Sequence, residues 1–192
     1  MSLSSQNAYN DIDKPIVARF SGLSQSGVYA AGYRAIDVAF APVRALVFAA
    51  YPAFFRRGAR GLKGSLAFAG RLMAPALLYA LCGAGLLWWL APLAGSVFGQ
   101  GFAETASVVR WLAVLLPLRT IHYLGQDALT GADRQGARTA IQGGVVAGNL
   151  ALSLLLIPRF GWRGAAAASI ASEMMLAVGV WAVAARLAAR EP

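Results

Sequence analysis

Charge is scarce in this chain, and that scarcity limits what the protein can be. Only 13% of its 192 residues are charged, while 58% are hydrophobic. A soluble domain carries roughly 25% charged residues because its surface must face water. The sequence therefore excludes an ordinary soluble domain and predicts a protein that lies in lipid.

Cysteine and histidine are nearly missing as well. Cys82 is the single cysteine and His122 the single histidine. One cysteine excludes an intramolecular disulfide, and one histidine without a nearby cysteine does not make a zinc site. We therefore expect no metal and no cofactor. The first fifteen residues lack the basic start and continuous apolar run of a secretory signal, so we expect no cleaved leader.

Long apolar runs are what the chain has instead. Residues 140–157 carry no charge, and residues 164–185 carry only Glu173. Each run approaches or reaches the roughly 17–25 residues that a helix needs to cross a hydrocarbon core. Between them, Pro158 and Gly161 are typical of a tight turn. The pattern predicts a transmembrane hairpin.

The same apolar pattern extends along the whole chain. It predicts an all-α integral membrane protein, a single lobe over residues 1–192 with about six transmembrane helices. We place the spans at 8–23, 26–55, 66–98, 106–129, 139–157 and 163–186. The first span is partial, because it holds several charges and each central charge costs about 2.5–3.5 kcal/mol on insertion.

The distribution of basic residues predicts the topology. Four of them follow the second span, which places that loop in the cytoplasm: Arg56, Arg57, Arg60 and Lys63. Alternation then puts both termini in the cytoplasm and 99–105 outside, although Arg159 and Arg163 lie outside against the rule. The same pattern accounts for the net charge of +9 better than nucleic-acid binding does, so we expect no nucleic-acid partner. Residues 56–63 would also suit anionic lipid head groups, although we expect their ordinary role as a topology anchor to dominate.

Small residues predict where the last span packs. Gly164, Ala168 and Ser172 recur at a four-residue spacing, as do Ala165 and Ser169. Such spacing lets helix backbones approach closely in lipid. The alternative is that alanine is simply abundant in this sequence.

Polar residues at helical spacing supply the candidate site. Three spans each carry a polar stripe: Arg34, Asp37 and Arg44 in the second, Arg119, His122 and Gln126 in the fourth, and Gln142 and Asn149 in the fifth. Ionisable groups at membrane depth usually face a bundle interior or a water-filled cavity. The alternative is structural: Arg34 pairs with Asp37, and the arginines extend to the interface.

His122 is open to two interpretations. Asp127 follows five residues later and would make a proton relay, but the two lie some 140° apart on an ideal helix. We therefore interpret His122 as a polar group that finds a buried partner.

Several segments resemble, in order, a family of membrane transporters. The strongest is 149–173, NLALSLLLIPRFGWRGAAAASIASE; the others are 11–14 with Phe20 and Gly22, 27–34 (GVYAAGYR), 51–56 (YPAFFR) and 98–99. Together they resemble the polysaccharide-exporter, or O-antigen-type, flippases of the MATE-like superfamily. Members move undecaprenyl-pyrophosphate-linked oligosaccharide across the bacterial inner membrane in surface polysaccharide and lipopolysaccharide biosynthesis.

The resemblance implies a fold of two six-helix lobes around a cavity, of which this chain resembles the C-terminal lobe only. We therefore expect a fragment, or a chain that pairs with a missing N-terminal lobe or a second chain, because alternating access needs two halves. Under this interpretation cationic and amide side chains would bind the pyrophosphate and sugar, and two carboxylates would orient them or couple to an ion. The substrate-binding candidates are Lys14, Arg34, Arg44, Arg119, Gln142 and Asn149, and the coupling candidates are Asp13 and Asp37.

Three alternatives stay open. A MATE-type drug or ion antiporter lobe would share the fold, although an arginine-rich cavity disfavours a cationic cargo. A non-transporting structural membrane partner would turn its polar stripes to lipid or to another chain. An enzyme is not expected, because Glu104 and Asp133, the only loop acids between the clear spans, fall on opposite membrane faces.

Overall fold

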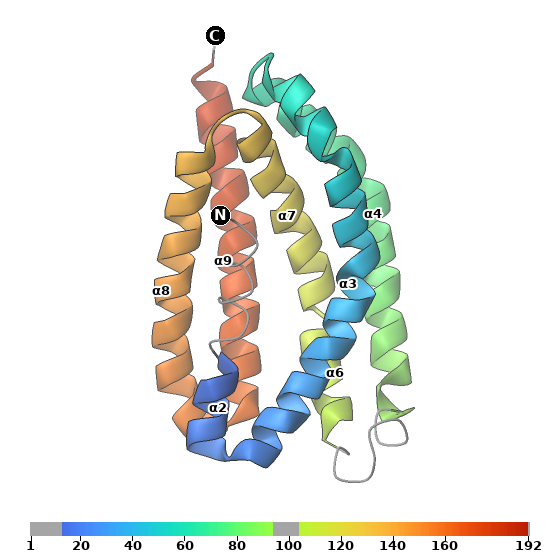
Figure 1. Ribbon diagram of the computed structural model, residues 1–192, viewed down its shortest axis with the longest axis vertical. Helices are drawn as coiled ribbons and strands as arrows, with labels where there is room; N and C mark the ends of the chain where they lie inside the picture. Colours follow the sequence, from blue (N-terminus) through green and yellow to red (C-terminus); the bar gives the residue numbers. More distant parts are fainter. Residues whose placement is uncertain (1–12, 94–103, 192) are drawn as a thin grey trace. The chain divides into compact units, whose positions relative to one another are not determined.

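Every regular element that the structure describes is a helix (Figure 1). The computed structural model describes residues 13–93 and 104–191. In chain order the elements are α2 (Asp13–Ser21), α3 (Leu23–Gly58), α4 (Leu62–Leu90), the 3₁₀-helix η1 (Ala91–Leu93), α6 (Thr105–Leu112), α7 (Leu115–Gly131), α8 (Gln135–Phe160) and α9 (Trp162–Ala189). The predicted all-α class is confirmed for these residues, whereas the predicted positions 8–12 and 94–98 lie outside them.

The chain divides into two compact units, which we describe separately. Unit 1 comprises Met1–Val38, Gly85–Val114 and Val146–Ser172, and unit 2 comprises Ala39–Ala84, Leu115–Val145 and Glu173–Pro192. Four long helices contribute residues to both units: α3, α4, α8 and α9.

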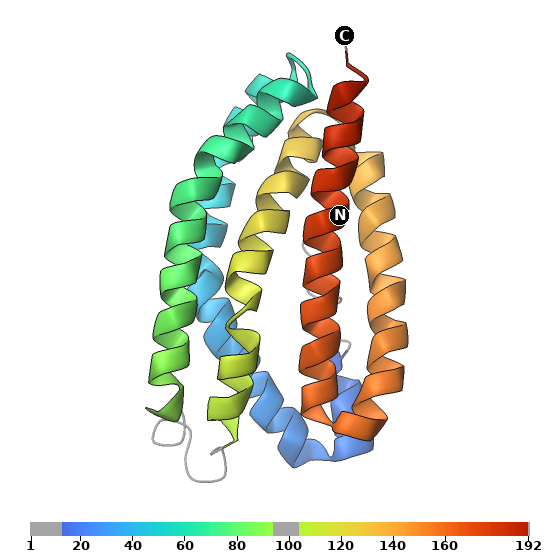
Figure 2. The same cartoon turned by 180° about the vertical axis from the view of Figure 1, so that it is seen from behind.

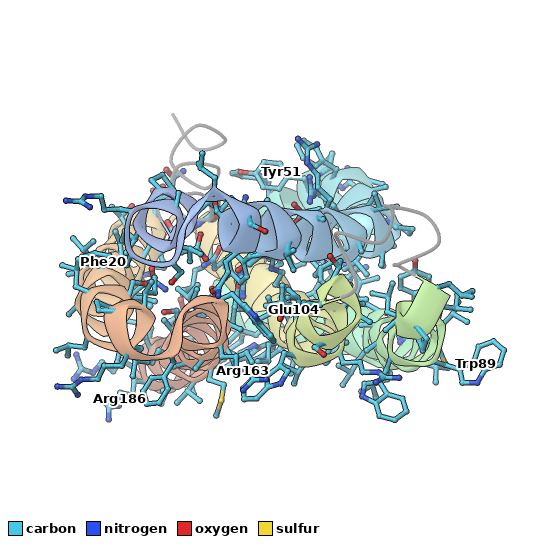
Figure 3. All side chains as sticks on the ribbon, turned by 90° about the horizontal axis from the view of Figure 1, so that it is seen from below. Phe20, Tyr51, Trp89, Glu104, Arg163 and Arg186 are labelled. Carbon is cyan, nitrogen blue, oxygen red and sulfur yellow. The ribbon has the colours of Figure 1, made fainter. Side chains whose placement is uncertain are left out.

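The same four helices are long and apolar enough to cross a membrane. At most 44% of the most apolar stretch of each is buried inside the protein. Large apolar side chains are left uncovered, such as Trp89 at 72% exposure and Val178 at 68%. Trp89 extends away from its neighbouring helices in Figure 3. So much bare apolar surface is unusual in a protein surrounded by water and suits lipid.

The first and fourth predicted spans differ from the helices that the structure describes. Of the predicted first span, the structure describes α2 over nine residues, Asp13–Ser21, which is shorter than a full crossing. The predicted span 106–129 consists of two helices rather than one, because the chain breaks after Leu112 and restarts as α7 at Leu115. Pro117 supplies the physical reason: it has no N–H to bond the carbonyl four residues before it.

The turn between α8 and α9 also differs from the prediction. Pro158 lies inside α8, and the helix continues to Phe160. Gly161 alone reverses the chain, with φ of +57°, and its N–H donates to the carbonyl of Ile157 at 2.8 Å. Only glycine adopts this left-handed conformation at little cost, so the helix ends on a glycine C-cap rather than on a proline turn.

Contacts within each unit show which connections share an end. In unit 2 the Glu191 carboxylate accepts hydrogen bonds from the Leu62 and Lys63 N–H groups and lies 3.7 Å from Arg134 Nη2. The C-terminus, the α3–α4 connection and the α7–α8 connection therefore meet. In unit 1 Trp162 Nε1 donates to Glu104 Oε2 at 3.3 Å, which joins the start of α9 to the start of α6. Within each unit, the connections that meet are those that the predicted alternation places on the same side of the membrane.

Glu191 is held as an anion at this junction. Its carboxylate accepts from the first backbone N–H groups of α4, which have no partners within the helix. The bond from Leu62 N–H lowers the pKa of Glu191, and the nearby Lys63 and Arg134 act in the same direction. The C-terminal segment is thus attached to α4 by a charge-assisted contact.

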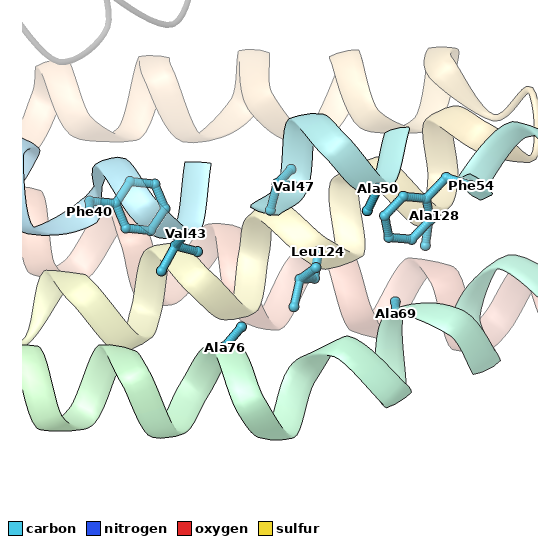
Figure 4. Close-up of a cluster of buried hydrophobic side chains, with 9 residues drawn as sticks. All are labelled: Phe40, Val43, Val47, Ala50, Phe54, Ala69, Ala76, Leu124 and Ala128. Atoms are coloured by element: carbon cyan, nitrogen blue, oxygen red, sulfur yellow. The ribbon is translucent and has the colours of Figure 1, made fainter. Parts of the chain in front are cut away.

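Unit 2 has an apolar core between α3, α4 and α7. Phe40, Val47 and Phe54 enter it from α3, Leu124 comes from α7, and small alanines from α4 and α7 fill the remaining space (Figure 4). The alternation of large and small side chains lets the helices pack closely.

Small residues join α8 and α9 in unit 1, where the two helices lie side by side (Figures 1 and 2). Gly164, Ala168 and Ser172 are all buried. A Cβ at Gly164 would lie 2.4 Å from the Leu156 carbonyl oxygen. Asn149 Nδ2 of α8 donates to Ser172 Oγ at 2.9 Å. The predicted close packing of this face is confirmed.

Candidate functional site

Three ionisable side chains form a buried cluster in unit 2, which we call the Arg119 cluster. Arg119 and His122 come from successive turns of α7, and Glu173 comes from α9. Arg119 Nε lies 3.2 Å from Glu173 Oε1, and His122 Nδ1 lies 2.7 Å from Glu173 Oε2. Their exposures are 2%, 3% and 3%. One carboxylate therefore lies between two basic groups, and all three side chains are almost fully buried.

Such a cluster is expensive to bury and is sensitive to the loss of any member. Removing one partner from a buried ion pair typically destabilises a protein by about 3–5 kcal/mol, because the other charge stays behind uncompensated. Intramembrane ionisable residues are rare for the same reason, and those that persist usually have a role. The Arg119 cluster is thus the strongest candidate site in unit 2.

Polar side chains continue along α7 and α8 from the cluster. Gln142 Nε2 donates to Gln126 Oε1 at 3.3 Å. One turn further, Arg138 Nη1 lies 3.8 Å from Asp127 Oδ1 and donates to Thr130 Oγ1 at 2.8 Å. The polar stripes predicted for the fourth and fifth spans therefore face each other here. Asp127 pairs with Arg138, and His122 Nδ1 contacts Glu173 Oε2, so the structure places a buried carboxylate beside His122.

Unit 1 holds a second buried cluster, which we call the Asp13 cluster: Asp13, Tyr29 and Ser169. Tyr29 donates its hydroxyl to Asp13 Oδ2 at 2.6 Å, and Ser169 Oγ donates to the same oxygen at 3.3 Å. Asp13 is 3% exposed and Tyr29 is fully buried. Asp13 Oδ1 accepts no hydrogen bond from the described residues. The cluster joins α2, α3 and α9 through oxygen atoms.

Lys14 lies beside the Asp13 cluster. Its Nζ is 5.2 Å from the centroid of the Tyr33 ring, which packs edge-on against Tyr29. Asn149 belongs to the same unit, and its Nδ2 donates between helices to Ser172 Oγ and, at 3.5 Å, to the Ala168 carbonyl. In this arrangement its amide N–H groups serve α8–α9 packing rather than an open site.

The remaining predicted residues lie on the surface of α3. Arg34 in unit 1 and Arg44 in unit 2 are exposed, and Asp37 is half-buried. The Arg44 guanidinium lies 5.9 Å from the ring centroid of Phe40 on its own helix. The two arginines are open to lipid, to solvent or to another chain, and the predicted binding and coupling roles of all three residues stay predictions.

Three residues of the two clusters were missed as site candidates: Glu173, Tyr29 and Ser169. Glu173 could have been found, because it is the only charge between residues 164 and 185. Tyr29 and Ser169 carry no such signal, since their role depends on contacts over 16 and 140 residues of sequence.

The fold and the two clusters define a class: an all-helical protein with several helices able to cross a membrane and with ionisable groups buried among them. Comparison with protein-family models, curated protein sequences and solved structures finds no match to this chain. The function is therefore argued from the residues themselves.

Proposed function

We propose that this chain is one lobe of a membrane transporter that carries an anionic, lipid-linked cargo. Its cargo class is undecaprenyl-pyrophosphate-linked oligosaccharide, moved across the bacterial inner membrane for surface polysaccharide export, with both termini cytoplasmic. The observation that carries the proposal is the Arg119 cluster: a guanidinium held in a water-excluded position by a carboxylate. Arginine is suited to this task because its planar fork can bind two phosphate oxygens at once.

The cluster suggests how such a cargo would bind. Glu173 neutralises Arg119 while the site is empty, so the buried guanidinium has a compensating charge. A pyrophosphate would compete with Glu173 for Arg119 and replace one anion by another. Gln126 and Gln142 lie on the same two helices and offer amide groups to sugar hydroxyls.

Transport needs a second lobe in this proposal. Alternating access arises when one half of a transporter rocks against another around a central site. The exposed Arg34 and Arg44 of α3 would then face the second lobe or the cavity between lobes, as would Lys14 and Asp37. A second chain or a second copy would supply that lobe.

Lipid binding by the chain in nanodiscs tests the proposal. We expect undecaprenyl pyrophosphate to bind at least tenfold more tightly than undecaprenol, which has the same tail without the charge. Arg119→Gln should weaken the binding of undecaprenyl pyrophosphate, whereas Glu173→Gln should strengthen it because it removes the competing anion. A general folding defect would instead weaken the binding of undecaprenyl pyrophosphate in both variants. Arg163→Gln is the matched control, since Arg163 is exposed at the start of α9 and should leave binding unchanged (Figure 3). Equal affinity for the two lipids would refute the proposal.

A further inference from the structure

The Arg119 cluster contains one group more than an ion pair needs. Arg119 and Glu173 already balance each other, yet His122 lies 2.7 Å from the second carboxylate oxygen. His122 is the only histidine of the chain. Histidine is a common proton acceptor in proteins, and its two protonation states differ by one charge.

Counting charges shows what a proton does here. Arginine stays protonated in proteins, so with neutral His122 the cluster holds one positive and one negative charge. A proton on His122 or Glu173 leaves one positive charge in excess. An uncompensated charge away from water is strongly unfavourable. The cluster therefore accepts a proton at low cost only if an anion arrives with it.

Among the residues that the structure describes, the neighbouring side chains of unit 2 do not supply that anion. Asp127, the one acid of α7, is buried and pairs with Arg138 of α8. Gln142 of α8 presents a neutral amide to Gln126. On the remaining sides Tyr123 stacks on the His122 ring at 4.7 Å between centroids, and Phe40 of α3 packs against Tyr123. The ionisable groups of α3 and α4 in this unit are exposed, among them Arg44 and Arg71.

We propose that His122 and Glu173 form the proton-binding site that couples to cargo, and that one proton enters the cluster with each anionic group that docks on Arg119. This inference rests on the proposed function and moves the coupling role from Asp13 and Asp37 to α7 and α9. Linkage makes the effect reciprocal: an anion that favours the protonated cluster binds more tightly when the cluster is protonated. The bridging carboxylate is essential, because without it an arriving anion neutralises Arg119 and no proton is needed.

The single histidine makes this directly measurable. The intact chain is labelled with ¹⁵N-histidine and placed in nanodiscs, and the imidazole ¹⁵N signals report the protonated fraction of His122 at about pH 7. Inorganic pyrophosphate is then added as the probe, and its ³¹P line width reports binding independently. We expect the protonated fraction of His122 to rise as pyrophosphate binds. In Glu173→Gln the rise should vanish although pyrophosphate still binds. Asp127→Asn, which alters the neighbouring pair, is the matched control and should keep the rise.

The outcomes separate the inference from the function on which it rests. Bound pyrophosphate with an unchanged His122 signal overturns the proton site and leaves the anionic cargo standing. A rise that persists in Glu173→Gln also overturns it, because the bridge would then have no part in the coupling. If the ³¹P signal shows no binding in the wild-type chain, the proposed function and this inference fail together.

Discussion

The closest helix contact in unit 2 gives a quantitative test of the packing. Gly58 ends α3 and lies against Gly131, the last residue of α7. A Cβ at Gly58 would stand 2.1 Å from the Gly131 carbonyl oxygen and 2.3 Å from its carbonyl carbon. Both obstacles are backbone atoms, which cannot rotate away. Gly58→Ala must therefore push the two helix ends apart.

The size of the effect follows from that geometry. Ordinary contact to a Cβ begins near 3.4 Å, so the helix ends must separate by about 1 Å. Overpacking of a well-packed core costs typically about 1–3 kcal/mol, and a backbone clash belongs at the upper end. We expect Gly58→Ala to destabilise the chain by about 2–3 kcal/mol, or roughly 30- to 150-fold in the unfolding equilibrium.

Gly70 supplies the matched control. It lies in α4 of the same unit, and a Cβ there meets nothing within 4 Å. Alanine favours a helix interior over glycine by about 0.8–1.0 kcal/mol, so Gly70→Ala should stabilise the chain or leave it unchanged. Both variants are compared with wild type by unfolding in mixed detergent–SDS micelles, followed by far-UV circular dichroism. Shifts of the same sign and size in the two variants would refute the reasoning.

Further changes test other contacts. Gly161→Ala should destabilise the chain by about 1–2 kcal/mol, because φ is +57° and a Cβ would lie 2.6 Å from Gln25 Oε1; a melting temperature equal to that of the wild type would contradict this. Asn149→Leu removes the hydrogen bond to Ser172 Oγ, and a double-mutant cycle with Ser172→Ala should give a coupling free energy of about 0.5–2 kcal/mol. A coupling of zero would show that this bond does not stabilise the chain. Since Glu191 has a lowered folded pKa, its contribution is present above the ordinary carboxyl pKa of about 4.3 and is lost as pH falls through the lowered value. As pH falls through the lowered pKa of Glu191, hydrogen exchange at the Leu62 amide should accelerate relative to neighbouring amides. Glu191→Gln should abolish this pH dependence.

Hydropathy predicted the long helices well because their length and apolar content are local properties. Residues 140–157 and 164–185 lie within α8 and α9, and the small-residue spacing at Gly164, Ala168 and Ser172 correctly located their contact. The loops sharing each end of a unit also followed from simple alternation. In these cases the sequence pattern and the packing obey the same periodicity.

The errors arose where one residue overrides a pattern. Pro158 suggested a turn, but proline fits within α8 near its end, and the positive φ of Gly161 decides where the chain reverses. Pro117 lies within the predicted fourth span, which the chain forms as two helices, α6 and α7. The missing N–H of Pro117 accounts for the break between them. Both outcomes depend on individual backbone hydrogen bonds, which hydropathy does not report.

Helical phase placed the candidate site only in part. It correctly put Arg119 and His122 on one face of α7 and brought Gln142 to Gln126. It could not identify Glu173 as their partner, because that pairing joins residues 54 positions apart through tertiary packing. A lone carboxylate in an otherwise uncharged span is the signal to follow in such sequences.

The most direct test of the central claim is transport of the proposed cargo. The chain is reconstituted in vesicles with a fluorescent undecaprenyl-pyrophosphate-linked oligosaccharide in both leaflets, and external dithionite bleaches the outer label. We predict that label from the inner leaflet becomes accessible faster with the chain than in empty vesicles, and that Arg119→Gln slows this while Arg163→Gln does not. Equal rates in empty vesicles and in vesicles with the wild-type chain, whose helical content, insertion and pairing into a two-lobe assembly are verified, would contradict the account.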